Sequence, residues 1–267
     1  MRQWFVLILL ALPLPILAAP LPERDSGLVE LSIWQAANGL SLGIETSVAQ
    51  HIPTGPSAVI SVLGLASGAV LPSQLTPKVT VGQAMLINAG TQMGVFNGLL
   101  VMRLTDGPLR DVPIGQLTGT LAGAVLARAR PPEAGRIALA QSAALWLGVG
   151  TLVQGSRHDE PLNPAILTAD AGWMLGYLLW PYMKVTRAQM AVFDVATAAG
   201  TLMGLLAGLE GHAEDRYTRA LVGLGVGAGL AVGILAAVHD WRDKPTPVAW
   251  GIQPLAGGAL VSVLGPW

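Results

Sequence analysis

The chain has 267 residues, of which 12% are charged and 52% hydrophobic, with 33 glycines and a formal net charge of −1. Ordinary soluble domains carry about 25% charged residues, so this composition favours a membrane protein. A near-neutral charge without a basic cluster argues against a nucleic-acid partner, and the absence of cysteine excludes disulfides, thiolate nucleophiles and cysteine-ligated zinc.

The N-terminus has the pattern of an export signal. Arg2 precedes the apolar run 4–17, which contains two prolines and is shorter than the ~20 residues of a transmembrane helix. We therefore predict a signal peptide at 1–18, cleaved after Ala18, and a polar lead-in at 19–27. An uncleaved anchor is the alternative.

A polar residue recurs at a constant position in four similar apolar segments. The clearest copy is 81–100, VGQAMLINAGTQMGVFNGLL. The recurring polar residues, each 53 positions after the one before, are Gln35, Asn88, Gln141 and Asp194. This period is close to those of helical-hairpin arrays, so we predict a four-fold repeat domain at 28–238.

Each repeat is expected to form two helices, because small residues recur every four positions instead of alternating as in a strand. Prolines at 56, 113 and 164 stand where the second helix of a pair begins, a place at which proline loses no helical hydrogen bond. The expected first helices are 28–47, 79–101, 134–153 and 185–209, and the second helices are 56–71, 113–127, 164–180 and 218–238. The predicted fold class is an all-α array or bundle of four helical hairpins.

Glycines spaced four apart mark one face of nearly every expected helix. Glycine costs about 0.8–1 kcal/mol relative to alanine in a water-exposed helix, and close approach of apolar helices offsets that cost. We assign helix packing to Gly64, Gly68, Gly90, Gly94, Gly119, Gly123, Gly172, Gly176, Gly200, Gly204, Gly229 and Gly233.

The combined pattern [EQR]-x-x-[ILV]-x-[NQD]-x-[AG] followed by G-x-x-x-G resembles the glycine-zipper repeats of largely uncharacterised Gram-negative envelope proteins. The resemblance covers about residues 28–238 and implies an envelope membrane setting. The third copy departs from it, since Ala140 and Ala144 replace glycines and only Gly148 remains.

Two stretches are long and apolar enough to cross a bilayer, 79–102 and 221–238, whereas 113–127 covers only about three-quarters of a ~30 Å hydrocarbon core. We expect an integral membrane protein that has the lipid bilayer as a partner. A soluble, tightly packed helical array and peripheral association are the alternatives.

Charge is distributed unevenly between the two ends of the expected helices. The basic end, where one pair is linked to the next, carries Lys78, Arg128, Arg130, Arg136, Lys184, Arg187, Arg242 and Lys244. If every helix spans, this end lies with the exported N-terminus, contrary to the positive-inside tendency. Either the N-terminal segment is not a signal peptide, or the membrane is not the inner one; we favour the outer membrane or the periplasmic face.

The tail at 239–267 contains an alternating stretch, with Ala259, Val261 and Val263 on one side. It predicts an irregular segment or a single strand. A final strand that ends in an aromatic residue resembles the recognition end of outer-membrane barrel proteins, and a packed surface tail is the alternative.

The sequence carries no catalytic signature, so we expect a non-enzymatic protein without cofactor or metal. A structural or assembly role is the first hypothesis, with further copies or other envelope proteins as partners. The alternatives are a small transporter or pore lined by the repeated polar positions, and a soluble periplasmic binding module. Asp194 and its possible companion Asp170 are the candidate intramembrane acids.

Overall fold

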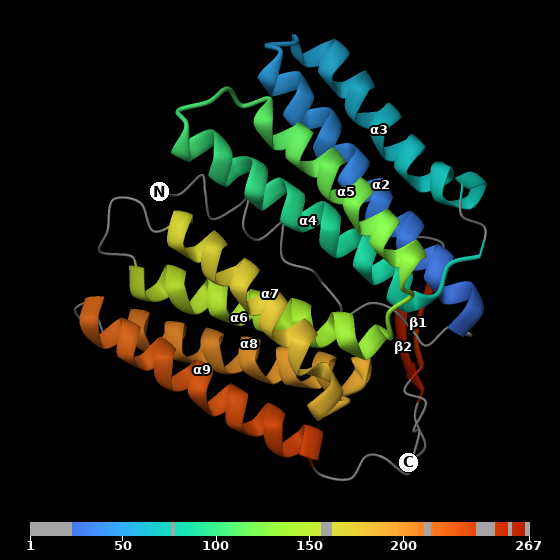
Figure 1. The fold of residues 1–267 in the computed structure, drawn as a ribbon. Helices are drawn as coiled ribbons and strands as arrows, with labels where there is room; N and C mark the ends of the chain where they lie inside the picture. Colours follow the sequence, from blue (N-terminus) through green and yellow to red (C-terminus); the bar gives the residue numbers. More distant parts are fainter. Residues whose placement is uncertain are drawn as a thin grey trace.

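The computed structural model describes residues 23–75, 78–155, 162–210, 215–238, 249–255 and 258–264. Within them, eight helices pair into four hairpins, and two strands follow (Figure 1). The hairpins are α2 (Glu23–Ala49) with α3 (Thr54–Leu75), α4 (Val81–Leu104) with α5 (Asp111–Ala129), α6 (Ala134–Gly155) with α7 (Leu162–Met183), and α8 (Arg187–Glu210) with α9 (Asp215–Val238). The predicted all-α array of four hairpins is confirmed, while the predicted signal peptide lies outside the described residues.

The helices form two layers: the first helices of the hairpins make one, and the second helices make the other, the outer layer. Helices α2, α4, α6 and α8 contact one another in that order. Each second helix packs on its own partner. The three that follow the first hairpin also contact the preceding hairpin: α5 contacts α2, α7 contacts α4 and α9 contacts α6. Consecutive hairpins therefore share interfaces along the whole array (Figure 1).

Local sequence signals explain where the helices begin. Thr80 and Gln83 form a reciprocal capping box at the start of α4, and Thr186 and Gln189 exchange the same pair of hydrogen bonds at the start of α8. Such a box satisfies two backbone N–H groups that have no partner inside the helix. The prolines at 56, 113 and 164 each occupy the third position of a second helix. A backbone N–H at this position would have no acceptor within the helix, so proline loses no hydrogen bond there.

The best-buried part of the molecule lies near the starts of the first helices. Ala84 and Ile137 have no exposed surface, and Leu31 of α2 and Met190 of α8 belong to the same apolar cluster. The four first helices thus converge on one core.

The tail forms two strands where a single strand was expected. β1 (Ala249–Leu255) pairs antiparallel with β2 (Gly258–Leu264), which contains the alternating residues seen in the sequence. The sequence does not predict β1, because this segment contains Gly251 and Pro254, and glycine and proline are depleted in strands.

Three described helices are long and apolar enough to cross a membrane: Thr54–Gln74, Val81–Leu104 and Ala134–Gln154. The second of them matches the span expected at 79–102. Helix α9, where a span was expected at 221–238, contributes the shorter apolar stretch Ala220–Gly229.

Candidate functional site: polar contacts within the apolar array

The first two repeated polar residues bond directly to each other. Gln35 Nε2 of α2 donates to Asn88 Oδ1 of α4 at 2.9 Å and also reaches Thr91 Oγ1 at 3.3 Å. Thr91 lies 2.8 Å from the hydroxyl of Thr120 on α5. Polar groups of three helices are therefore connected where the first two hairpins meet.

Asp194, the fourth repeated residue, bonds to side chains that the repeat did not single out. Ser142 Oγ lies 2.7 Å from each carboxylate oxygen, and Trp146 Nε1 donates to Oδ1 at 2.9 Å. Both donors belong to α6, so the carboxylate joins the last two hairpins. The sequence signal was present, because Ser142 is a polar residue in an apolar helix and Trp146 lies one turn beyond it.

Gln141, the third repeated residue, occupies a different environment. Its side chain lines a pocket of about 150 Å³ between α4, α6 and α7, and the described part of the chain offers it no hydrogen-bond partner. The four aligned polar residues therefore do not all make the same kind of contact in the structure.

Asp170 of α7 lines the same pocket. Asn97 Nδ2 of α4 donates to its Oδ1 at 3.2 Å and also to the backbone oxygen of Met93 at 3.0 Å. The sequence suggests Asp170 as a companion of Asp194, but the two carboxylates have partners on different helices, α4 and α6.

The assigned glycines face the partner helix of their own hairpin. With the exception of Gly233, whose surroundings are outside the described residues, a Cβ added to any of them would lie closer than 3 Å to backbone atoms of that partner. At Gly94 the obstacles are Gly115 and Gly119, and at Gly204 they are Leu221 and Val222. Side chains at these positions would push two backbones apart.

The third hairpin is packed differently, and this is the copy in which alanines replace glycines. Gly176 of α7 still meets the backbone of Ala140. Ala144, however, lines the pocket next to Gly148. The departure in the sequence thus coincides with incomplete filling of the space between α6 and its neighbours.

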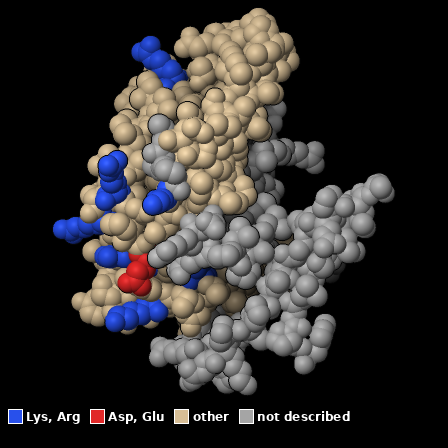
Figure 2. Space-filling view, turned by 90° about the vertical axis from the view of Figure 1, so that its right-hand side faces the viewer, with Lys and Arg blue, Asp and Glu red and all other residues tan. Residues whose placement is uncertain are grey.

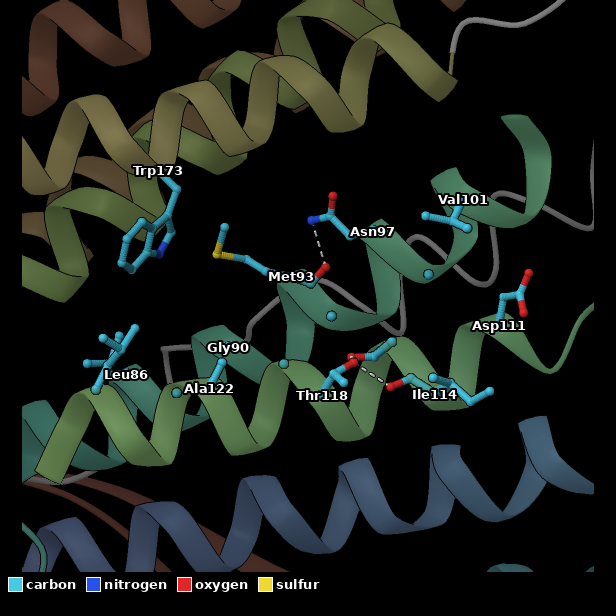
Figure 3. Close-up of a pocket in the computed structure, with 16 residues that line it drawn as sticks. Leu86, Gly90, Met93, Asn97, Val101, Asp111, Ile114, Thr118, Ala122 and Trp173 are labelled. Atoms are coloured by element: carbon cyan, nitrogen blue, oxygen red, sulfur yellow. Dashed lines mark hydrogen bonds between the residues drawn. The ribbon is translucent and has the colours of Figure 1, made fainter. Parts of the chain in front are cut away.

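A larger groove of about 620 Å³ runs along α4 and α5. Figure 3 shows Met93 and Asn97 on α4, Thr118 and Ala122 on α5, and Trp173 on α7 around this groove. Glycines of α4 and α5 form much of its floor, and most of its other residues are apolar. It has no constellation of groups for acid–base or nucleophilic chemistry.

The basic end of the array also joins its first and last hairpins. Arg187 Nη1 of α8 donates to Glu30 Oε2 of α2 at 2.6 Å, across 157 residues of sequence. Figure 2 views this end and shows Lys and Arg side chains along one edge, with little Asp or Glu among them. Arg242 and Lys244, also assigned to this end, lie outside the described residues.

No group of three or more His, Cys, Asp or Glu side chains that could hold a metal occurs in the described part of the chain. In comparisons with known proteins, the chain matches no family model, no curated protein and no solved structure. Its function therefore has to be inferred from its own surface and contacts.

Proposed function

We propose that this chain is a non-enzymatic protein embedded in a membrane of the cell envelope, where it has a structural or assembly role. The observation that carries the proposal is the outward surface of α3. Only 6% of the apolar window in Thr54–Gln74 is buried within the molecule. In water this would be a large unprotected apolar surface, whereas in a bilayer it meets lipid chains.

The outer layer continues this surface beyond α3. Large apolar side chains with more than half of their surface exposed include Val62 and Leu63 on α3, Leu121 on α5, Leu178 on α7 and Leu224 on α9. A soluble binding module would expose such residues to water in every hairpin. This surface therefore favours the membrane protein over the soluble alternative.

The internal contacts favour a structural role over a pore. Gln35 and Asn88 bond to each other, and the Asp194 carboxylate accepts hydrogen bonds from Ser142 and Trp146. Hydrogen bonds of this kind hold neighbouring helices together, as a structural role requires. The glycine faces support the same role, with further copies or other envelope proteins as partners.

For the compartment, we propose the outer membrane or the periplasmic face. The basic end of the array supports this choice, since a signal peptide would place that end outside the cytoplasm, where an inner-membrane protein tends to lack lysine and arginine.

Fractionation of a Gram-negative bacterium that produces the full chain tests both parts of the proposal. We expect the protein to stay in the membrane pellet after alkaline carbonate extraction and to sediment with the outer membrane in a density gradient. Release into the supernatant would contradict the membrane setting, and sedimentation with the inner membrane would contradict the compartment.

A liposome flux assay separates the structural role from the transporter alternative. Purified protein is reconstituted into vesicles loaded with potassium chloride and a small dye. A structural protein leaves the leak of both solutes at the level of protein-free vesicles, and a selective, protein-dependent flux would favour the transporter.

A further inference from the structure

The pocket between α4, α6 and α7 contains an acid and two amides with unused hydrogen-bonding capacity. Asp170 accepts one hydrogen bond, from Asn97. Gln92 and Gln141 line the same pocket, and neither amide has a hydrogen-bond partner among the described residues. No Lys, Arg or His in the described part of the chain forms an ion pair with Asp170.

The packing of α4 against α7 does not require Asn97 and Asp170, as the equivalent helix pairs of the repeat show. One period earlier, where α2 meets α5, the positions of Asn97 and Asp170 are occupied by Ile44 and Leu117. One period later, where α6 meets α9, both positions are glycine. The two equivalent crossings thus form without an amide or an acid at these two positions.

Several features of the pocket suit one class of ligand. Asp170 is half-buried, and a carboxylate partly withdrawn from water gains from a positive partner. Aromatic faces attract cations from which water has been removed. Phe96 and Trp173 line the pocket together with Asp170. Its volume of about 150 Å³ matches that of cavities known to hold a molecule as small as benzene.

We propose that this pocket binds a small organic cation, a protonated amine with a short hydrocarbon part, and that Asp170 is its counter-ion. The ammonium group donates to Asp170 and to the amide oxygen of Gln92 or Gln141. The hydrocarbon part packs against Phe96, Leu145 and Trp173. This site goes beyond the structural role, which requires no ligand.

Calorimetric titration of the detergent-solubilised full chain with butylamine, which is protonated at neutral pH, tests the proposal. 1-Butanol serves as the uncharged probe of similar size, and protein-free micelles give the partition background. We expect saturable binding of butylamine at least about tenfold tighter than that of 1-butanol, a difference that corresponds to about 1.4 kcal/mol. Equal binding of the two probes, or no binding of butylamine, would overturn the proposal.

Variants locate the site. Asp170→Asn removes the charge with little change of shape and should weaken butylamine binding at least about tenfold, whereas 1-butanol binding should not change. Asp194→Asn is the matched control, because its carboxylate already bonds to Ser142 and Trp146, and it should bind butylamine like the unmodified chain. Unchanged binding by Asp170→Asn would show that this carboxylate is not the counter-ion.

A second variant keeps the test decisive if Asp170→Asn does not fold. Ala144→Leu leaves Asp170 in place and extends a side chain into the pocket that Ala144 lines. We expect the folded variant to lose butylamine binding. Retained affinity in this variant would place the amine elsewhere and contradict the proposal.

Discussion

Asp194 and Gln35 occupy equivalent repeat positions but bond in opposite senses. Gln35 donates through its amide to Asn88, whereas Asp194 accepts from Ser142 and Trp146. A carboxylate at a bilayer centre costs about 2.5–3.5 kcal/mol on insertion scales, and these two donors offset part of that cost. Both residues therefore act as connectors between hairpins.

The first prediction separates the hydrogen bonds of Asp194 from its charge. Asp194→Asn keeps an oxygen acceptor for Ser142 and should leave the protein folded. Asp194→Leu removes the acceptor from a serine whose surface is only 2% exposed, and should lower the free energy of unfolding by about 1–2 kcal/mol. Thermal or denaturant unfolding in micelles measures the difference. A leucine variant as stable as the unmodified chain would refute the structural role, and loss of a measured ion flux in a folded Asp194→Asn would make the carboxylate the working group.

At the scale of the helix pair, backbone contact between glycines determines how closely the two helices approach. Helix α9 offers a comparison within one element. A Cβ at Gly225 would meet backbone atoms of Gly200 and Gly204, whereas a Cβ at Gly223 would have nothing within 4 Å.

The second prediction uses this pair of glycines. Gly225→Ala should separate α8 from α9 and lower stability by about 1–3 kcal/mol, as overpacking does elsewhere. Gly223→Ala makes the same chemical change in open space and should be neutral or stabilise by about 0.4–1 kcal/mol. Unfolding of both variants in micelles provides the measurement. Equal effects at the two positions would contradict packing by glycine faces.

The third prediction extends the comparison to a larger side chain on α4. Gly94→Leu should prevent folding, because its side chain would enter the backbone of Gly115 and Gly119. Met102→Leu on the same helix is a volume-conserving change and should cost less than about 1.5 kcal/mol. The yield of monodisperse protein after detergent extraction compares the two, and similar yields would speak against the steric explanation.

Helix-level features were largely predictable from sequence, whereas contacts between distant elements were not. The spacing of small residues four positions apart and the positions of the prolines located all eight described helices, because both signals are local. The repeat placed Gln35 and Asn88 at equivalent positions, and the fold bonds them. It did not lead to Ser142 or Trp146, since a partner one residue or one turn away from the aligned position depends on how two helices rotate against each other.

On the scale of the whole molecule, the array brings its first and last hairpins together at one end. The Glu30–Arg187 ion pair makes this contact. No local pattern in the sequence marks this contact, because it depends on how all four hairpins are arranged.

The fourth prediction tests this closure with cysteine chemistry, which is convenient because the chain has no cysteine of its own. Glu30→Cys combined with Arg187→Cys should react with a short bis-maleimide to give an internal cross-link. After cleavage at a protease site introduced into the link at 156–161, the two fragments should stay together on a denaturing gel. The single-cysteine variants are the controls, and fragments that separate in the double variant would contradict the closure.

We propose that the outer layer of this array faces lipid, and site-directed spin labelling in liposomes measures which side chains contact lipid and which contact water. Single cysteines replace Leu63, Leu121 and Leu178, whose side chains are 60%, 65% and 61% exposed, and Arg130→Cys after α5 serves as the reference at the basic end. We predict high accessibility to oxygen and low accessibility to a water-soluble nickel chelate at the three leucine positions, with the opposite ratio at Arg130. High accessibility to the nickel chelate at all four positions would contradict the claim and favour a soluble array.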